Sequence, residues 1–347
     1  MDSHRKSSRL VKKKSFSFLI LFVTIIAMLF LSEIVLRLLH NSRPQNEFGL
    51  NTLLRKSTVP GLQWELTPGF TSEKYTINSQ GFRGVEFTVN KDSSVKRIAC
   101  IGDSHCFGLG VYEDARIYPS LLQEKLSTQQ RVEVLNFGVP GYNTWQEFSQ
   151  LQNVVLELKP DIVILGFFFN DSDGNTRITT KDGIQSLRSQ NPVAQSTSYT
   201  SWLKQSRLVL ALKEVFEIGV LALFDYHPNY IDLKIKTERW SEMKSMLAQM
   251  ASLLREKQIQ FLVVVFPMTY QLTAPESESA AQQDILSFLQ EQQIDFINLF
   301  PRFRQFLQQN DFDYKKLIVK GIRDSHPTAA GHALTAEAIV KYFQSMK

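Results

Sequence analysis

The sequence predicts an α/β fold in which a parallel sheet is covered by helices on both faces. Two observations carry this prediction. From Arg97 onward, short apolar runs alternate with longer segments of helical periodicity. Two of the runs, Ile162–Leu165 and Phe261–Val265, are apolar at every position. Strands have this composition when both faces of their sheet are buried, which is the rule in parallel α/β folds.

The individual elements follow from where each periodic run begins and ends. Five strands are predicted, at Ile98–Ile101, Val132–Asn136, Asp161–Phe169, Gln260–Phe266 and Asp295–Leu299. Five helices are predicted between and after them, at Tyr118–Leu126, Thr144–Leu158, Thr237–Lys257, Ala280–Gln292 and Ala329–Met346. A strand followed by a helix, repeated in this way, is typical of parallel sheets with crossover connections.

The N-terminus combines a basic tail, residues 1–14, with an apolar segment, residues 15–36. The stretch from Ser15 to Ser32 has no charged side chain and spans about 27 Å as a helix, close to the thickness of a hydrocarbon core. The positive-inside rule then predicts a single-pass signal anchor in the cell membrane, with a cytoplasmic N-terminus and a periplasmic or extracellular remainder. A cleaved signal peptide is the alternative, but no small-x-small cleavage site follows Ser32.

Three further regions complete the predicted domain organisation. Residues 37–93 contain turn signals between short alternating runs, which predicts a β-rich lead-in with strands at Tyr75–Ile77 and Val85–Val89. Residues 94–347 form the main domain. An insert at about 172–235 interrupts it, and charges within Leu208–Phe224 favour an amphipathic cap or lid helix over a second membrane span.

The net charge of +5 is concentrated at the N-terminus. Residues 1–40 carry seven Lys or Arg and two acidic side chains, and the remaining 307 residues carry 32 of each sign. A body without excess positive charge argues against a nucleic-acid partner. The two cysteines, Cys100 and Cys106, are expected to be buried thiols, because a bridge between them would strain the turn that separates them. Metal and phosphate-binding motifs are absent from the sequence, so no metal or cofactor is predicted.

Four polar motifs fall at strand ends or just before the last helix. They are Gly102-Asp-Ser104, Asn136-Phe-Gly-Val-Pro-Gly141, Gly166-Phe-Phe-Phe-Asn170-Asp171 and Arg323-Asp324-Ser-His326. Open α/β sheets place their sites at the carboxyl ends of their strands. Each motif alone is also explained by a helix cap, an Asx-turn or a packed histidine.

Together the motifs predict acyl transfer through a serine nucleophile. Ser104 would attack, His326 would act as the base, and Asp324 would orient its imidazole. The backbone N–H groups of Ser104 and Gly141 and the side-chain amide of Asn170 would receive the oxyanion. His332 lies six residues after His326, but it is expected within the last helix, facing away from Ser104.

In this order, the four motifs resemble the GDSL, or SGNH, hydrolase family, over the chain from about Arg97 to its C-terminus. The letters of SGNH are matched by Ser104, Gly141, Asn170 and His326. The resemblance implies a flavodoxin-like three-layer α/β/α sandwich. It also implies ester or thioester hydrolysis or, in some branches, O-acetyl transfer on polysaccharides.

The chain departs from the family pattern at three places. His105 occupies the position of the leucine in the family name, and Phe168 stands where glycine usually precedes the asparagine by two positions. The usual Asp-x-x-His is shortened to Asp324-Ser-His326, with Arg323 at the usual acid position. The short spacing resembles that of alginate O-acetyltransferase-like relatives.

The sequence therefore predicts a membrane-anchored acyl ester hydrolase acting on O-acyl groups. The predicted location favours an envelope carbohydrate or glycolipid as substrate. An O-acetyltransferase is one alternative, and it would need a partner protein to supply the acyl donor. A non-catalytic scaffold of an envelope-polysaccharide system is the other.

Overall fold

The computed structural model describes residues 24, 27–35, 50–128, 130–172, 176–180, 184–189, 235, 237–273, 279–319 and 325–346. The chain divides into two compact units. The first comprises Met1–Glu47 and Pro192–Pro228, and the second comprises Phe48–Asn191 and Asn229–Lys347.

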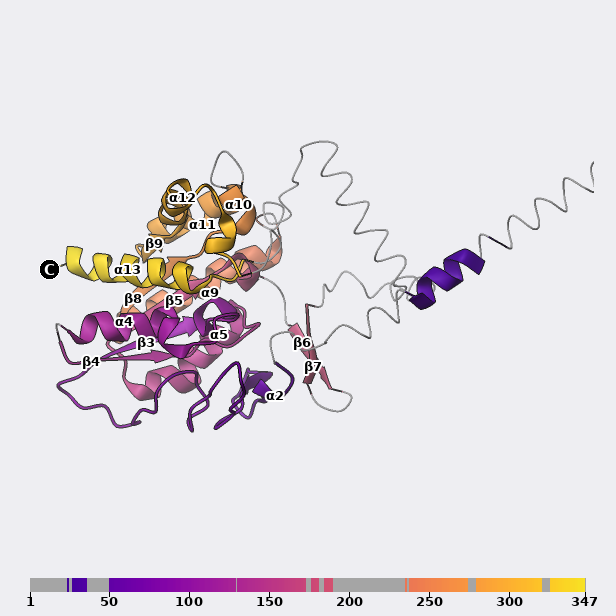
Figure 1. Cartoon of the computed structure of the whole chain (residues 1–347). Helices are drawn as coiled ribbons and strands as arrows, with labels where there is room; N and C mark the ends of the chain where they lie inside the picture. Colours follow the sequence, from indigo (N-terminus) through magenta and orange to yellow (C-terminus); the bar gives the residue numbers. More distant parts are fainter. Residues whose placement is uncertain are drawn as a thin grey trace, which may run out of the picture. The chain divides into compact units, whose positions relative to one another are not determined.

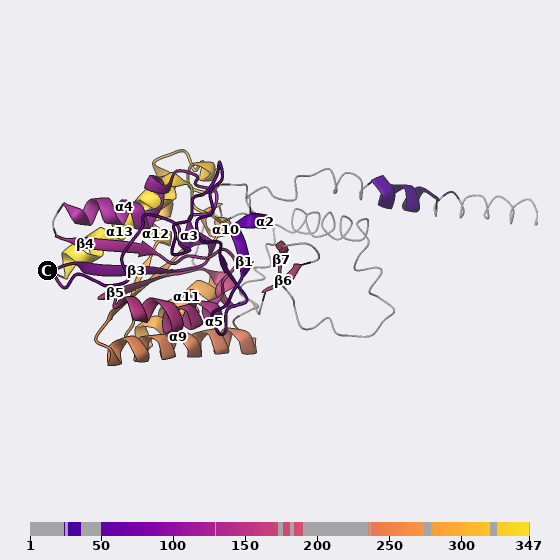
Figure 2. The same ribbon diagram turned by 90° about the horizontal axis from the view of Figure 1, so that it is seen from below.

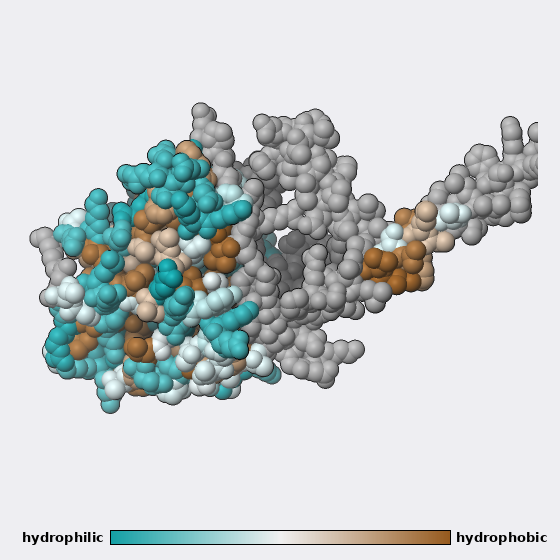
Figure 3. Space-filling model, in the orientation of Figure 1, coloured by the Kyte–Doolittle hydropathy of each residue, from teal (hydrophilic) through white to brown (hydrophobic). Residues whose placement is uncertain are grey.

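In the first unit, residues 27–35 are helical. Their apolar side chains are largely exposed (Figure 3), and these are Met28, Leu29, Phe30, Leu31, Ile34 and Val35. Among the helices that the structure describes, none is both long and apolar enough to cross a membrane. Most of the predicted anchor at 15–36 lies outside the described residues, so it stays a prediction. The same holds for the predicted cap helix at Leu208–Phe224.

The second unit is built on a five-stranded sheet in which every pairing is parallel. Its strands are β3 (Lys96–Gly102), β4 (Val132–Asn136), β5 (Ile162–Phe167), β8 (Gln260–Val265) and β9 (Asp295–Asn298). Their spatial order is β4-β3-β5-β8-β9, which is the flavodoxin order. The prediction of an α/β fold with a parallel sheet is therefore confirmed. In this order the chain reverses direction across the sheet between β3 and β5, where ligands bind in such folds.

Helices cover both faces of this sheet (Figures 1 and 2). On one face lie α4 (Tyr118–Ser127), α12 (Phe300–Gln308) and α13 (Ala329–Ser345). On the other lie α5 (Thr144–Gln150), α9 (Glu238–Glu256) and α11 (Ala280–Glu291). Successive residues of β3 alternate between the two cores, with Ile98 and Cys100 in one and Ala99 and Ile101 in the other. This alternation is why strands with two buried faces read as continuous apolar runs.

The predicted helix at Thr144–Leu158 changes its winding along its length. It is α-helical to Gln150, widens to a π-helix over Leu151–Val155, and ends as a 3₁₀ turn over Leu156–Leu158. The Leu156 N–H bonds to the Leu151 carbonyl, five residues back. The wider turn keeps Leu151, Val155 and Leu158 in the same core.

Several smaller elements were not predicted. They are α2 (Leu50–Leu53), α3 (Ser104–Phe107), α10 (Thr269–Thr273), the 3₁₀ turns at Asp114–Arg116, Phe169–Ser172 and Tyr314–Lys316, and the hairpin of β6 (Thr176–Thr180) and β7 (Ile184–Ser189). The hairpin lies within the insert predicted as a cap. The helix α12 was also missed, although Pro301 in its first turn is a start signal.

The described part of the lead-in, residues 50–93, contains less β-structure than expected. Within it, only β1 (Leu54–Lys56) and β2 (Trp64–Leu66) form a hairpin, and Tyr75–Ile77 contributes to isolated bridges. The predicted strand at Val85–Val89 is wrong. The segment does alternate, with Val85 and Val89 72% and 61% exposed and Phe87 buried. Side chains rather than a neighbouring strand satisfy its carbonyls: Asn78 donates to Val85, and Gln80 donates to Phe87.

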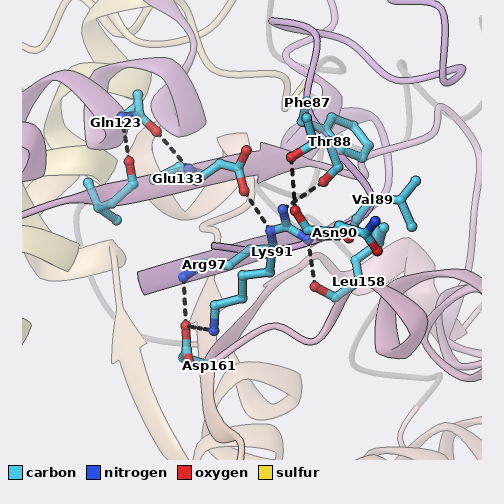
Figure 4. Close-up of polar contacts among 12 residues, drawn as sticks. Phe87, Thr88, Val89, Asn90, Lys91, Arg97, Gln123, Glu133, Leu158 and Asp161 are labelled. Atoms are coloured by element: carbon cyan, nitrogen blue, oxygen red, sulfur yellow. Dashed lines mark hydrogen bonds and ion pairs between the residues drawn. The ribbon is translucent and has the colours of Figure 1, made fainter. Parts of the chain in front are cut away.

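The buried side chain of Arg97 attaches the lead-in to the parallel sheet (Figure 4). Its guanidinium donates to the carbonyls of Thr88, Val89 and Leu158 and forms an ion pair with Glu133 at 2.5 Å. One side chain thus ties the lead-in to β4 and to the end of the helical segment that precedes β5.

Arg97→Met is expected to lower the free energy of unfolding by about 3 kcal/mol, because it leaves buried acceptors and Glu133 without their donor. Urea denaturation measures the loss. Arg131→Met is the matched control, since Arg131 pairs with Asp92 on the surface, where both side chains are more than half exposed. Its midpoint should hardly move. Equal midpoint shifts in the two variants would contradict the role given to Arg97.

Candidate active site

Ser104 lies at the carboxyl end of β3, where a tight turn starts the four-residue helix α3. Gly102 has a φ of +149°, and a Cβ there would come within 3.0 Å of the Gly166 carbonyl oxygen. The turn therefore requires glycine. Asp103 caps α3 by accepting a hydrogen bond from the His105 N–H at 2.7 Å. Ser104 is 6% exposed, so its side chain has little access to bulk water.

His326 lies in the loop before α13 and reaches the nucleophile candidate directly. Its Nε2 is 2.8 Å from Ser104 Oγ, which is hydrogen-bond distance. The loop is fixed by its backbone, because the Val319 N–H donates to the His326 carbonyl and the Thr328 N–H to the Leu317 carbonyl. Asp324, the predicted acid, lies outside the described residues.

Asn170 follows β5, the strand next to β3 in the sheet. The chain changes direction across the sheet between these two strands. Its Nδ2 donates to Asp103 Oδ2 at 3.0 Å. An amide carries two N–H groups, so this bond orients the second one. Asp171 accepts a hydrogen bond from the Phe168 N–H and shapes the 3₁₀ turn that presents the amide.

Gly141 ends the loop after β4 with a φ of +81°. The loop is pinned on both sides: the Val139 N–H donates to the Gly102 carbonyl, and the indole of Trp64 donates to the Pro140 carbonyl at 3.1 Å. Within the described part of the chain, no group accepts a hydrogen bond from the N–H of Gly141 or of Ser104. Both donors are available to a bound oxyanion.

Asn170→Ala removes a third candidate oxyanion donor, the side-chain amide, and is expected to lower kcat by roughly 10²–10³-fold. Steady-state kinetics on a short-chain ester measures the loss. Asn153→Ala is the control, because the Asn153 amide donates to Ser149, one turn before it in the same helical segment. If Asn170→Ala kept the turnover of Asn153→Ala, Asn170 would have no part in oxyanion binding.

The carboxylate of Asp103, the residue before Ser104, accepts hydrogen bonds from His105 and Asn170. Burial alone would raise the pKa of Asp103, but the charge of His105 and the hydrogen bonds from His105 and Asn170 outweigh it and hold that pKa below its ordinary value. Asp103 is therefore ionised at neutral pH. From its sequence position in the Gly102-Asp-Ser104 turn, Asp103 is predicted only to cap the following helix.

Glu147 on α5 is a second buried acid near this turn. It is fully buried, and neither carboxylate oxygen has a hydrogen-bond partner among the described residues. Burial and, secondarily, the charge of Asp103 raise the pKa of Glu147 well above its ordinary value of 4.5. Glu147 is therefore held in its neutral form in the folded protein.

This burial makes stability depend on pH. Above about pH 4.5 the unfolded chain loses the Glu147 proton while the folded chain keeps it, so the Glu147 contribution to stability falls as pH rises. Glu147→Gln is expected to be more stable than the natural chain, by a margin that grows from pH 5 to pH 8. Urea denaturation across this range measures it. A margin independent of pH would contradict a neutral Glu147.

His332 is occupied elsewhere, as the sequence analysis expected. It lies in the first turn of α13, where its Nδ1 accepts a hydrogen bond from the Tyr118 N–H at 3.2 Å. Burial, followed by the positive charges around it, lowers the pKa of His332 to about 3. Cys100 and Cys106 are both free and buried, as predicted. In the described residues, no cluster of three or more His, Cys, Asp or Glu side chains could hold a metal ion.

The model of the GDSL-like lipase/acylhydrolase family matches residues 100–334, more than half of the chain. The chain belongs to this family. The match begins in β3 and ends in α13, so it includes all four polar motifs. As a member of the GDSL-like family, the protein is a hydrolase acting on ester bonds.

Several solved structures are similar to this chain. One is the acetyl xylan esterase AlAXEase, with a TM-score of 0.44, 13% identity and coverage of 71% of this chain and 98% of that one. TesA gives a TM-score of 0.43, 14% identity and coverage of 73% and 100%. A catalytic mutant of Axe2, an acetylxylan esterase from Geobacillus stearothermophilus, gives a TM-score of 0.44 and 12% identity, with coverage of 71% of this chain and 93% of that one. No match is found among curated protein sequences.

Proposed function

We propose that this GDSL-like protein hydrolyses O-acyl esters of an envelope carbohydrate or glycolipid through an acyl-Ser104 intermediate. The observation that carries the proposal is the 2.8 Å contact between Ser104 Oγ and His326 Nε2, beside donors that are free to bind an oxyanion. A serine hydroxyl is a weak nucleophile unless a base within hydrogen-bond reach accepts its proton. Asp324, two residues before His326 in the sequence, is proposed as the acid that orients the imidazole.

The proposed reaction has two halves. Ser104 Oγ attacks the acyl carbonyl carbon while His326 Nε2 takes its proton, and the N–H groups of Ser104 and Gly141 and the amide of Asn170 stabilise the oxyanion. Collapse breaks the bond to the alcohol, which leaves with the proton from His326. Water, deprotonated by His326, then attacks the acyl-Ser104 carbonyl, and Ser104 is released with the free acid.

The substrate class rests on the proposed location. The basic tail at 1–14 and the apolar segment at 15–36 favour a single membrane anchor with the enzyme outside the cytoplasm. The exposed apolar side chains of residues 27–35 support this placement. A reporter fused after Lys347 tests it: activity of a reporter that works only in the cytoplasm would overturn the location and, with it, the envelope substrate.

The mechanism is tested with a fluorophosphonate probe, which reacts with activated serines. Labelling of the full chain that is lost in Ser104→Ala is expected. Labelling that persists in Ser104→Ala would exclude Ser104 as the nucleophile.

Hydrolysis is separated from acyl transfer by supplying an activated acetyl ester with and without oligosaccharide acceptors. Acetate release that does not change with the acceptor is expected for the proposed hydrolase. Acetylated sugar forming faster than free acetate would instead identify an O-acetyltransferase. The short Asp324-Ser-His326 spacing resembles that of alginate O-acetyltransferase-like proteins.

A further inference from the structure

The three departures from the family pattern meet at one side chain, His105. Its ring stacks on Phe168, with centroids 4.1 Å apart, and bonds to the carbonyl of Ser325 inside the shortened Asp324-Ser-His326 segment. Residues that are far apart in the sequence thus form one contact set.

We propose that His105 is a positioning residue that, as an imidazolium, ties the Ser104 turn to the His326 loop and fixes the plane of the His326 ring. The proposal deepens the proposed function and rests on it, because it takes Ser104 and His326 as the reacting pair. It assigns His105 no contact with substrate.

The hydrogen bonds of His105 link the two segments. Its Nδ1 lies 3.1 Å and 3.3 Å from the two carboxylate oxygens of Asp103, and its Nε2 lies 3.2 Å from the Ser325 carbonyl oxygen. Asp103 immediately precedes Ser104, and Ser325 immediately precedes His326. The ring therefore bridges the residues next to the proposed nucleophile and base.

The partners of His105 also determine its protonation. A carboxylate and a backbone carbonyl can only accept hydrogen bonds, so a neutral ring would leave one nitrogen lone pair facing an acceptor. Only the ring with protons on both nitrogens donates to both partners. Asp103 supplies the compensating negative charge, and His105 is fully buried, so the pair is shielded from solvent.

Stacking extends the linkage to the ring of His326. The rings of Phe168, His105 and His326 lie in sequence, with interplanar angles of 27° and 24° and centroids 4.1 Å and 5.0 Å apart. Phe266, after β8, packs at the edge of the same group, 5.3 Å from His105. A positively charged ring is stabilised on an aromatic face, which a glycine at position 168 would not provide.

The geometry makes the proposed alignment depend on His105 in two ways. Asp103 Oδ2 also accepts the hydrogen bond from Asn170, so the carboxylate held by His105 orients an oxyanion donor. Loss of the ring would remove the side-chain contact between the His326 loop and this carboxylate, which would then keep only the hydrogen bonds from the His105 N–H, Asn170 and Ser104. A displacement of reacting groups by about 1 Å costs about 10²-fold in rate.

The first test measures protonation and needs no activity. In ¹⁵N-histidine-labelled full-length protein at pH 7, both ring nitrogens of His105 are expected to show the shifts of protonated nitrogens, with the signal assigned by its loss in His105→Leu. His332 is an internal control, because its Nδ1 accepts from the Tyr118 N–H and must show an unprotonated shift. A neutral tautomer at His105 would overturn the proposal.

The second test measures positioning. His105→Leu is expected to lower kcat and the rate of fluorophosphonate labelling by about 100-fold, with KM nearly unchanged. Phe168→Gly should also lose rate, and the double variant should lose less than the product of the two losses, because the rings act as a unit. His332→Gln, a change at another buried histidine, should label at the rate of the natural chain.

The outcomes separate this proposal from the proposed function. A natural chain that does not label would contradict the serine mechanism, while the ¹⁵N shifts would still decide the state of His105. Labelling of folded His105→Leu at the natural rate would overturn the positioning role and leave the mechanism intact. If His105→Leu does not fold, His105→Gln replaces it, with an expected rate between those of leucine and histidine because an amide retains a donor.

Discussion

Ser104→Ala is expected to lower kcat for ester hydrolysis by roughly 10⁴–10⁶-fold, the range expected when a serine mechanism loses its nucleophile. In the proposed mechanism Ser104 Oγ forms the acyl intermediate, and the 2.8 Å contact with His326 Nε2 would activate it. Burst-phase kinetics with a chromogenic short-chain ester measures both turnover and acyl-enzyme formation. No burst is expected in the variant.

Ser279→Ala is the matched control for this loss. Ser279 is 6% exposed, as Ser104 is, but it caps α11 by accepting a hydrogen bond from the Gln282 N–H. The control should lose about 1 kcal/mol of stability and none of the activity per folded molecule. A Ser104→Ala variant as active as Ser279→Ala would end the serine mechanism.

His326→Gln is expected to give the second large loss, roughly 10⁴-fold or more in kcat, because the proposed base for the Ser104 proton is then absent. Fluorophosphonate labelling of Ser104 should slow in parallel, since the probe also requires an activated hydroxyl.

His332→Gln separates this effect from the general cost of removing a buried histidine. His332 bonds to Tyr118 and stacks on its ring, with centroids 5.9 Å apart, so its replacement should lower the unfolding temperature without changing the activity of the folded enzyme. Inactive His332→Gln together with active His326→Gln would show that the wrong histidine has been assigned as the base.

The sheet could be predicted from the sequence because its strands are buried on both faces. All five predicted strands are present, with ends within two residues of those expected. The segment Val85–Val89 has an equally good alternating pattern and forms no strand. Its carbonyls are satisfied by Asn78, Gln80 and Arg97, side chains from both flanks, and no local pattern reports such contacts.

The site was predictable where it depends on the ends of strands and unpredictable where it depends on side chains meeting in space. Ser104 and His326 meet as expected, and Asn170 joins them through Asp103. The network around His105 was missed because its members come from four segments. The signal was present in the sequence, since His105, Phe168 and the shortened Asp324-Ser-His326 were each visible as departures, but only the structure shows that they contact one another.

The two cysteines give the enzyme a built-in reporter of local opening. Cys100 lies in β3 and Cys106 in α3, on either side of Ser104, and both thiols are fully buried. Burial raises the pKa of both thiols, so neither reacts while the segment stays closed. The rate of alkylation therefore measures how often the segment that carries the proposed nucleophile, Ser104, opens locally. Measured with and without a bound inhibitor, it reports how far ligand binding suppresses that opening.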